Sequence, residues 1–276
     1  MAFTIVGDAA VVSGNCSDSR KAAVFTGGNT DDYYQINTWA TDRVTANDTR
    51  GTIIAWIMPG DKTGTYSIIN AGDNDAVEFL EFNVEAGKLA CRCTDATTAQ
   101  FISATNSVVI QPHVWTHVAV VQNADLIGPK FYVNGVRVAS TNSTTTDLNE
   151  WFNNCDGIDK GCIGAANKSG NAAITNEFVG GISDLKYYNS ALTDEQIADD
   201  YRGTVLTTGL TDYWKMADLS NETTAANTMT EVSDVYLTPT YNEFISRVRK
   251  FGAVVADTAG FNENMGRMSV MFINAA

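Results

Sequence analysis

The chain has 276 residues, a length that suits one β-sandwich with an additional segment. Lys and Arg together number 18 against 32 Asp and Glu, and the resulting net charge of -14 would repel phosphate backbones and anionic lipid surfaces. We therefore expect no nucleic-acid partner, and no membrane insertion because no stretch approaches the length of a membrane-spanning helix. The first 14 residues lack a basic region and are interrupted by Gly7 and Asp8, so they do not predict a secretory signal.

Apolar runs of strand length recur between turn signals along the chain. Residues 52–60 and 114–122 are apolar on both alternating faces, which is typical of central strands covered on both sides. Asn134 and Gly135 stand between two β-rich runs and predict a tight hairpin, because both residues tolerate positive φ. Further strands are predicted at residues 33–36, 66–70, 77–84, 88–94, 161–164 and 181–188. This regular spacing predicts an all-β fold, an antiparallel β-sandwich.

One short helix is predicted directly after the strand at 181–188. Thr193 can cap it, and Gln196, three residues further on, can complete a capping box. Leu192 and Ile197 are spaced as a hydrophobic staple, and Gly203 suits the left-handed position after the helix. We expect a two-turn helix with a structural role, which closes one end of the sandwich.

Five motifs follow one another in the order and spacing of a known family: FTGGNTDDYYQI, TIIAWIMP, WTHVAVV, FYVNGVRVA and GGISDLKYYNSALTDEQIADDY. Together they resemble the laminin G-like, concanavalin A-like jelly-roll domains over about residues 20–203. The resemblance implies a jelly roll of two sheets in residues 1–203, followed by an extension in residues 204–276. Members of the family are mostly binding and adhesion modules, including lectin-like domains, matrix domains and parts of phage and viral particles.

The resemblance also implies a metal site. Jelly rolls of this family commonly hold one Ca²⁺ where the first and last strands meet, which in this chain is near Asn29, Asp31, Asp32 and Asp184. Thr26 stands where the family has an acid. For sugar binding, exposed aromatic side chains on loops are needed beside polar groups. The candidates in loop-like sequence are Trp39, Trp151 and Phe152.

The extension after residue 203 has two predicted parts. The segment from Gly209 looks like the strand that usually leads into such a domain, although here it follows one. Beyond Thr238, apolar residues fall at helical spacing, and these candidates for an assembly contact are Tyr241, Phe244, Ile245, Val248 and Phe251. The extension could donate a strand to its own sandwich or dock on a neighbouring subunit, and the sequence leaves both open.

No pattern of residues predicts catalysis. His113 and His117 have the spacing of a metalloprotease pair, but they would converge only on a helix and stand in a predicted strand. Glu78 and Glu81 are separated by an odd number of residues, so a strand would point them to opposite faces. Of the five cysteines, Cys155 and Cys162 bracket a turn and could pair in an oxidising setting or remain reduced in the core.

These observations predict a non-enzymatic structural or attachment protein on the surface of a virus particle, a phage. The composition resembles that of an extracellular protein, being rich in Thr, Asn, Gly and Asp, yet no export signal is expected. Its partners would be other virion proteins, further copies of itself or a cell-surface glycan. The alternatives are a carbohydrate-binding lectin, secreted by a route without a signal peptide, and a polysaccharide-active enzyme.

Overall fold

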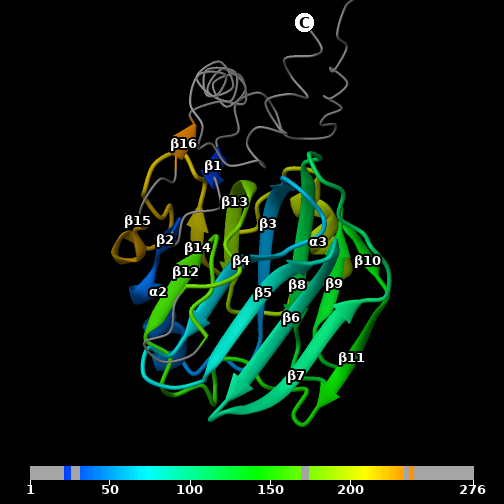
Figure 1. Cartoon of the computed structure of the whole chain (residues 1–276), viewed down its shortest axis with the longest axis vertical. Helices are drawn as coiled ribbons and strands as arrows, with labels where there is room; N and C mark the ends of the chain where they lie inside the picture. Colours follow the sequence, from blue (N-terminus) through cyan, green and yellow to red (C-terminus); the bar gives the residue numbers. More distant parts are fainter. Residues whose placement is uncertain (1–21, 26–31, 169–173, 233–235, 239–276) are drawn as a thin grey trace, which may run out of the picture.

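The computed structural model describes residues 22–25, 32–168, 174–232 and 236–238, in which two antiparallel sheets pack face to face (Figure 1). The predicted all-β jelly-roll sandwich is confirmed. The first sheet has the order β10 (Val136–Val138), β9 (Lys130–Val133), β8 (Thr116–Gln122), β3 (Gly51–Pro59), β13 (Gly180–Tyr188), β1 (Ala22–Phe25) and β16 (Tyr236–Thr238), and β14 (Leu210–Trp214) also pairs with β13. The second has the order β11 (Ser140–Thr145), β7 (Thr98–Thr105), β6 (Lys88–Asp95), β5 (Phe79–Glu85), β4 (Thr65–Gly72), β12 (Lys160–Ile163), β2 (Tyr33–Gln35) and β15 (Thr230–Val232).

The central strand β3 is buried along its whole length, and the two sides of the strand face different cores. Ile53 and Ile57 point into the cluster between the two sheets. Ile54 points the other way, into a smaller cluster beneath the helix α3 (Asp194–Tyr201). The prediction that this strand is covered on both sides is therefore confirmed, and it explains why the strand lacks a polar face.

The helix α3 begins and ends as its sequence predicts. Thr193 accepts a hydrogen bond from the backbone N–H of Gln196, whose side chain accepts one from the N–H of Thr193. Gly203 has a φ of +96°, in the left-handed region that glycine adopts without strain. The expected position at one end of the sandwich is wrong, however. Ile197 packs with Val121 and other residues of the first sheet's outer face, so the helix lies on that face.

A second helix, α2 (Asn37–Thr45), occupies a segment that the sequence indicated as a loop. Its first residue follows Ile36, which makes no side-chain capping hydrogen bond, so the usual start signal is absent. The helix nevertheless buries Trp39, Ala40 and Arg43, which lie on one side at helical spacing. Packing against the sandwich therefore stabilises a helix that local sequence signals do not predict.

The described chain beyond Gly203 joins both sheets. In β14, Trp214 pairs with Leu185 and Asp212 with Tyr187 of β13. A short 3₁₀ helix, η1 (Ala225–Asn227), precedes β15, which pairs with β2, and β16 pairs with β1. The described part of the extension, as far as Thr238, therefore adds strands to its own sandwich, which is one of the two alternatives. The expected domain boundary at residue 203 lies within the sandwich. The assembly candidates Tyr241, Phe244, Ile245, Val248 and Phe251 lie outside the described residues.

The hairpin predicted at Asn134 and Gly135 joins β9 to β10, and these two turn residues have φ values of +50° and +79°. Both residues are in the left-handed region, as the sequence predicts. Among the described residues, no helix is both long and apolar enough to cross a lipid bilayer.

Candidate functional site

The three aromatic residues expected to bind sugar lie in the core instead. Trp39, Trp151 and Phe152 each have 0% exposed surface. The ring of Trp39 lies edge-on to those of Phe152 and Trp214, at centroid distances of 5.7 and 6.0 Å. The prediction that these side chains are exposed on loops is wrong, because α2 turns Trp39 inward, Phe152 packs against it, and Trp151 packs against Phe152. A ring with no exposed surface offers no face to a sugar.

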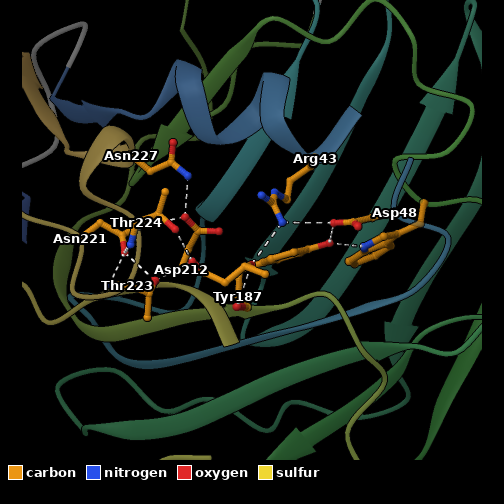
Figure 2. Close-up of polar contacts among 10 residues, drawn as sticks. Arg43, Asp48, Tyr187, Asp212, Asn221, Thr223, Thr224 and Asn227 are labelled. Atoms are coloured by element: carbon orange, nitrogen blue, oxygen red, sulfur yellow. Dashed lines mark hydrogen bonds and ion pairs between the residues drawn. The ribbon is translucent and has the colours of Figure 1, made fainter. Parts of the chain in front are cut away.

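A buried polar network borders this aromatic cluster (Figure 2). Arg43 of α2 donates through Nη1 to Oδ2 of Asp48 at 3.4 Å and to the hydroxyl of Thr211 at 3.2 Å. The hydroxyl of Tyr187 donates to the same Asp48 oxygen at 2.9 Å. Burial raises the pKa of Asp48 despite these donors, and the nearby charge of Asp212 acts in the same direction. The network thus ties α2 to β13 and β14.

Asp212 organises the other half of the network. Its Oδ1 accepts hydrogen bonds from the amide groups of Asn221, at 2.9 Å, and Asn227, at 2.7 Å. The side-chain oxygen of Asn221 in turn accepts backbone N–H groups of Thr223 and Thr224, which shapes the turn before η1. Figure 2 shows these side chains converging between β14 and η1. Because Asp212 is fully buried, we assign the network to holding the C-terminal strand rather than to a ligand.

A second buried cluster anchors α3 to the first sheet. Asp200 of α3 lies with Oδ1 at 3.1 Å from both Nε2 of His117 and Nζ of Lys186. Burial opposes ionisation of Asp200, but the hydrogen bond from His117 and the charge of Lys186 lower its pKa overall. His117 stands on β8, whereas His113 lies in the turn before that strand. The two histidines do not lie on a helix, in agreement with the sequence analysis. His117 instead contacts Asp200 and so helps to anchor α3.

The expected calcium residues are only partly within the described chain. Asn29 and Asp31 lie outside it. Asp32 is buried just before β2 of the second sheet, and Asp184 lies on β13 of the first sheet, where its Oδ1 accepts a hydrogen bond from the hydroxyl of Tyr213 at 2.6 Å. Within the described residues, no three His, Cys, Asp or Glu side chains gather closely enough to hold a metal ion. The four-residue calcium set remains a prediction.

The two glutamates considered for catalysis hold different segments of the chain. Glu78 accepts a hydrogen bond from the backbone N–H of Gly157 at 2.8 Å. Glu81 lies 2.9 Å from Nζ of Lys168 and accepts a hydrogen bond from the amide of Asn176 at 2.7 Å. Burial raises the pKa of Glu78, with further contributions from the charges of Asp95 and Asp73. Both carboxylates therefore have internal contacts that explain their presence.

The four described cysteines are free and buried, namely Cys91, Cys93, Cys155 and Cys162. The sulfur of Cys155 lies 3.7 Å from that of Cys93, so its neighbour in the core is not the Cys162 suggested by the sequence. These thiols pack as small apolar side chains, one of the two alternatives that the sequence allowed.

An open groove lies at one edge of the sandwich, and we call it the edge groove. It has a volume of about 460 Å³, and its lining includes Ile127, Pro129, Lys130, Arg137, Val138 and Asn142. The strands β10 and β11 are the end strands of their sheets, and only Ala139 separates them in the chain. The groove therefore forms where the chain crosses from one sheet to the other, beside the loop that precedes β9.

The loop beside the edge groove is fixed by polar contacts. The amide of Asn142 donates to the carbonyl of Ile127 at 2.8 Å and its oxygen accepts from the hydroxyl of Ser103 at 2.6 Å. Nζ of Lys130 lies 2.5 Å from Oδ2 of Asp125. Burial opposes ionisation of Asp125, but the hydrogen bonds from Lys130 and from the backbone N–H of Ile127 help to lower its pKa overall. Ile127 is nevertheless 56% exposed, so the groove combines a fixed frame with open apolar surface.

The sequence analysis missed the edge groove. Its lining comes from two stretches of the chain, 127–130 and 137–142, and neither has a recognisable ligand motif. One signal was available: Leu126 and Ile127 are adjacent large apolar residues in an otherwise polar loop, and they are 71% and 56% exposed. Exposed apolar residues next to one another commonly mark a contact surface.

Comparison with known proteins identifies a family. The model of the family Laminin_G_3, described as the concanavalin A-like lectin/glucanases superfamily, matches residues 27–198. Among curated proteins, none is similar enough in sequence to count as a relative.

Several solved structures have a similar fold. CBM40 of the Ruminococcus gnavus IT-sialidase, bound to α2,3-sialyllactose, has a TM-score of 0.52 and 14% identity, covering 65% of this chain and 97% of that chain. A leech intramolecular trans-sialidase complexed with 2,7-anhydro-Neu5Ac has a TM-score of 0.52 and 18% identity, covering 68% of this chain and 29% of that chain. A heptameric SAP-like pentraxin from Limulus polyphemus has a TM-score of 0.51 and 12% identity, covering 82% and 97%. At these identities the likeness concerns the fold.

Proposed function

The chain belongs to the concanavalin A-like lectin/glucanase superfamily, and on that premise we propose that it is a non-enzymatic glycan-binding module whose binding site is the edge groove. The observation that carries this proposal is the composition of the groove. Sugars present apolar C–H faces together with hydroxyl groups, and the groove offers the exposed Ile127 beside the donors of Lys130 and Arg137. Its volume of about 460 Å³ lies within the range of about 300–1,000 Å³ that is usual for small-molecule sites.

Two further observations support the proposal. A similar fold binds sialyllactose in CBM40 of Ruminococcus gnavus, although fold alone does not transfer a ligand. Glycoside hydrolysis requires two carboxyl groups flanking one bond, whereas Glu78 and Glu81 are each committed to another segment of the chain. Binding without catalysis is therefore the function that the described residues fit best.

A glycan array tests the proposal with the full chain. We expect the wild type to bind a subset of the glycans on the array. The variant Ala139→Trp should not bind them, because an indole would fill the groove that Ala139 helps to line. Val136→Trp is the matched control, since Val136 is 67% exposed on β10, three residues before Ala139, but does not line the groove. Equal binding by both variants would place the site elsewhere, and an array without any binding would contradict the proposed function.

Calcium is a separate proposal for Asn29, Asp31, Asp32 and Asp184. A cation that binds only the folded chain raises its stability, by about 2.7 kcal/mol at a concentration one hundred times the dissociation constant. We expect added Ca²⁺ to raise the melting temperature and a chelator to reverse the rise. The variant Asp32→Asn tests the assignment, and a melting temperature that does not respond to Ca²⁺ in the wild type would refute it.

Display on a virus particle is a second proposal, and it is supported by composition and by the apolar residues of the segment 239–276. Light scattering after size-exclusion chromatography would compare the full chain with a chain ending at Thr238. The truncation should not be placed at Gly203, because β14, β15 and β16 pair with strands of the sandwich. An oligomeric full chain and a monomeric truncation are expected. Two monomers would contradict assembly through this segment.

A further inference from the structure

The charge of the edge groove is opposite to that of the chain. The whole protein has a net charge of -14, yet the groove lining contains two cations, Lys130 and Arg137, and no carboxylate. An acidic chain repels acidic ligands at long range, so a locally cationic groove is where such a ligand could bind. This inference rests on the proposed function and names the class of glycan.

The two cations of the groove are not equivalent. Lys130 is already paired with Asp125, whose carboxylate lies 2.5 Å from its ammonium group. Arg137 is exposed and, within the described part of the chain, forms no ion pair. Of the two cations, Arg137 is therefore the one without a direct carboxylate partner, although its charge also acts on Tyr132, whose hydroxyl donates to Asp194.

Arg137 also has a suitable position. Its backbone pairs with Tyr132 of β9, so the base of the side chain is held by the first sheet. A guanidinium group presents two parallel N–H donors, which match the two oxygens of a carboxylate better than they match a hydroxyl group. Ile127, which is 56% exposed, lines the same groove and provides apolar surface for the ring that carries the carboxylate.

We propose that the edge groove selects acidic glycans, and that Arg137 binds the carboxylate of an acidic sugar while the ring of that sugar lies against the apolar part of the lining. Lys130, neutralised by Asp125, then serves hydroxyl groups rather than a second acid. Selectivity for acidic over neutral glycans follows from a single unpaired guanidinium.

Matched ligands test the proposal in isothermal titration of the full chain. Trigalacturonic acid and a hyaluronan tetrasaccharide are each compared with their carboxyl methyl esters, which keep the shape and remove the charge. We expect the wild type to bind at least one acid about tenfold or more tightly than its ester, the effect of one charge-assisted hydrogen-bonded pair. This preference should weaken as salt is raised, because the groove is open to solvent.

Variants identify the residue. Arg137→Gln should reduce the preference for the acid to about one, and Arg137→Lys should restore part of it, since the charge returns without the fork. Arg202→Gln is the matched control, because Arg202 is an exposed arginine directly after α3 and outside the groove. Asp125→Asn should strengthen binding of the acid by several-fold, as it releases Lys130 from its partner. Unchanged melting temperatures confirm that each variant is folded.

Each outcome separates the two proposals. Binding of neutral glycans and esters as tightly as of both acids would overturn the inference and leave glycan binding intact. A preference for the acid that survives Arg137→Gln would also overturn the inference, because another group would then bind the carboxylate. Absence of all binding, to these ligands and on the glycan array, would overturn both.

Discussion

Removing the side chain of Trp214 tests whether the strand after the family domain is part of one cooperative sandwich. Trp214 of β14 is fully buried, and its indole N–H donates to the carbonyl of Asn227 at 2.8 Å. Replacing a buried Trp by Ala costs about 3–5 kcal/mol through lost apolar burial and the cavity that remains. The stability of a domain is about 5–15 kcal/mol, so Trp214→Ala should remove a large fraction of it.

Urea and thermal unfolding followed by far-ultraviolet circular dichroism measure this loss. Circular dichroism is preferred because the substitution removes one of the five tryptophans that would report by fluorescence. For a chain of this size, each kcal/mol lowers the melting temperature by about 2–4 °C, so we expect a fall of roughly 6–20 °C. Val136→Ala serves as the control, since Val136 is 67% exposed and its truncation should change stability by less than about 0.5 kcal/mol.

A loss below about 1 kcal/mol in Trp214→Ala would refute the reasoning. So would a chain ending at Gly203 that unfolds with the stability of the full chain. Either result would mean that the sandwich is complete without β14. We expect the opposite, because Trp214 of β14 contacts Trp39 and β14 pairs with β13.

Three further predictions concern a cap, a histidine and a thiol. Thr193→Ala should destabilise the protein by about 1 kcal/mol in urea unfolding, because it removes the acceptor for the N–H of Gln196, and Thr193→Ser should recover most of this loss. Burial lowers the pKa of His113 in the folded protein below its ordinary value of about 6.5, so the unfolded chain binds more protons and stability falls as the pH drops through that value. The difference in unfolding free energy between pH 7.5 and pH 5.5 should be smaller in His113→Gln, and an unchanged difference would contradict the assignment. Burial raises the pKa of Cys162 to about 12, so iodoacetamide at pH 8 should label this thiol only after denaturation, and rapid native labelling seen by peptide mass spectrometry would show that the thiol is accessible.

Local signals in the sequence identified much of the fold. The Asn134-Gly135 turn and the capping box at Thr193 appear where they were predicted, because each depends on two to four neighbouring residues. The apolar run at 52–60 also predicted correctly that β3 is covered on both sides. In each case the relevant physical interaction acts over a few residues, so the chain itself contains the information.

Contacts between distant segments were not accessible in the same way. The segment 37–45 has no capping signal, and its Trp39 is buried by Trp214, which lies beyond the family domain. A tryptophan in polar sequence therefore suggested an exposed ligand contact when it is a core residue. The error arose because exposure is decided by tertiary partners that the sequence does not identify.

The candidate site was hidden for a related reason. Arg137 is one of 18 basic residues, and nothing in its neighbours distinguishes it. Only the structure shows that Lys130 is paired with Asp125 while Arg137 is not, and that both line one groove with Ile127. The sequence could identify a family of binding modules, whereas the candidate ligand surface forms only where residues 127–130 and 137–142 meet at a sheet edge.

The order of the strands gives the groove a definite place relative to the C-terminal strands. The groove lies at β10 and β11, the edge strands of the two sheets on one side of the sandwich. The strands β16 and β15 are the edge strands on the opposite side (Figure 1). Thr238, after which the segment 239–276 continues, is therefore across the sandwich from the groove. If the two proposals both hold, the ligand would bind at one edge of the domain, and the described chain ends at Thr238 on the other edge.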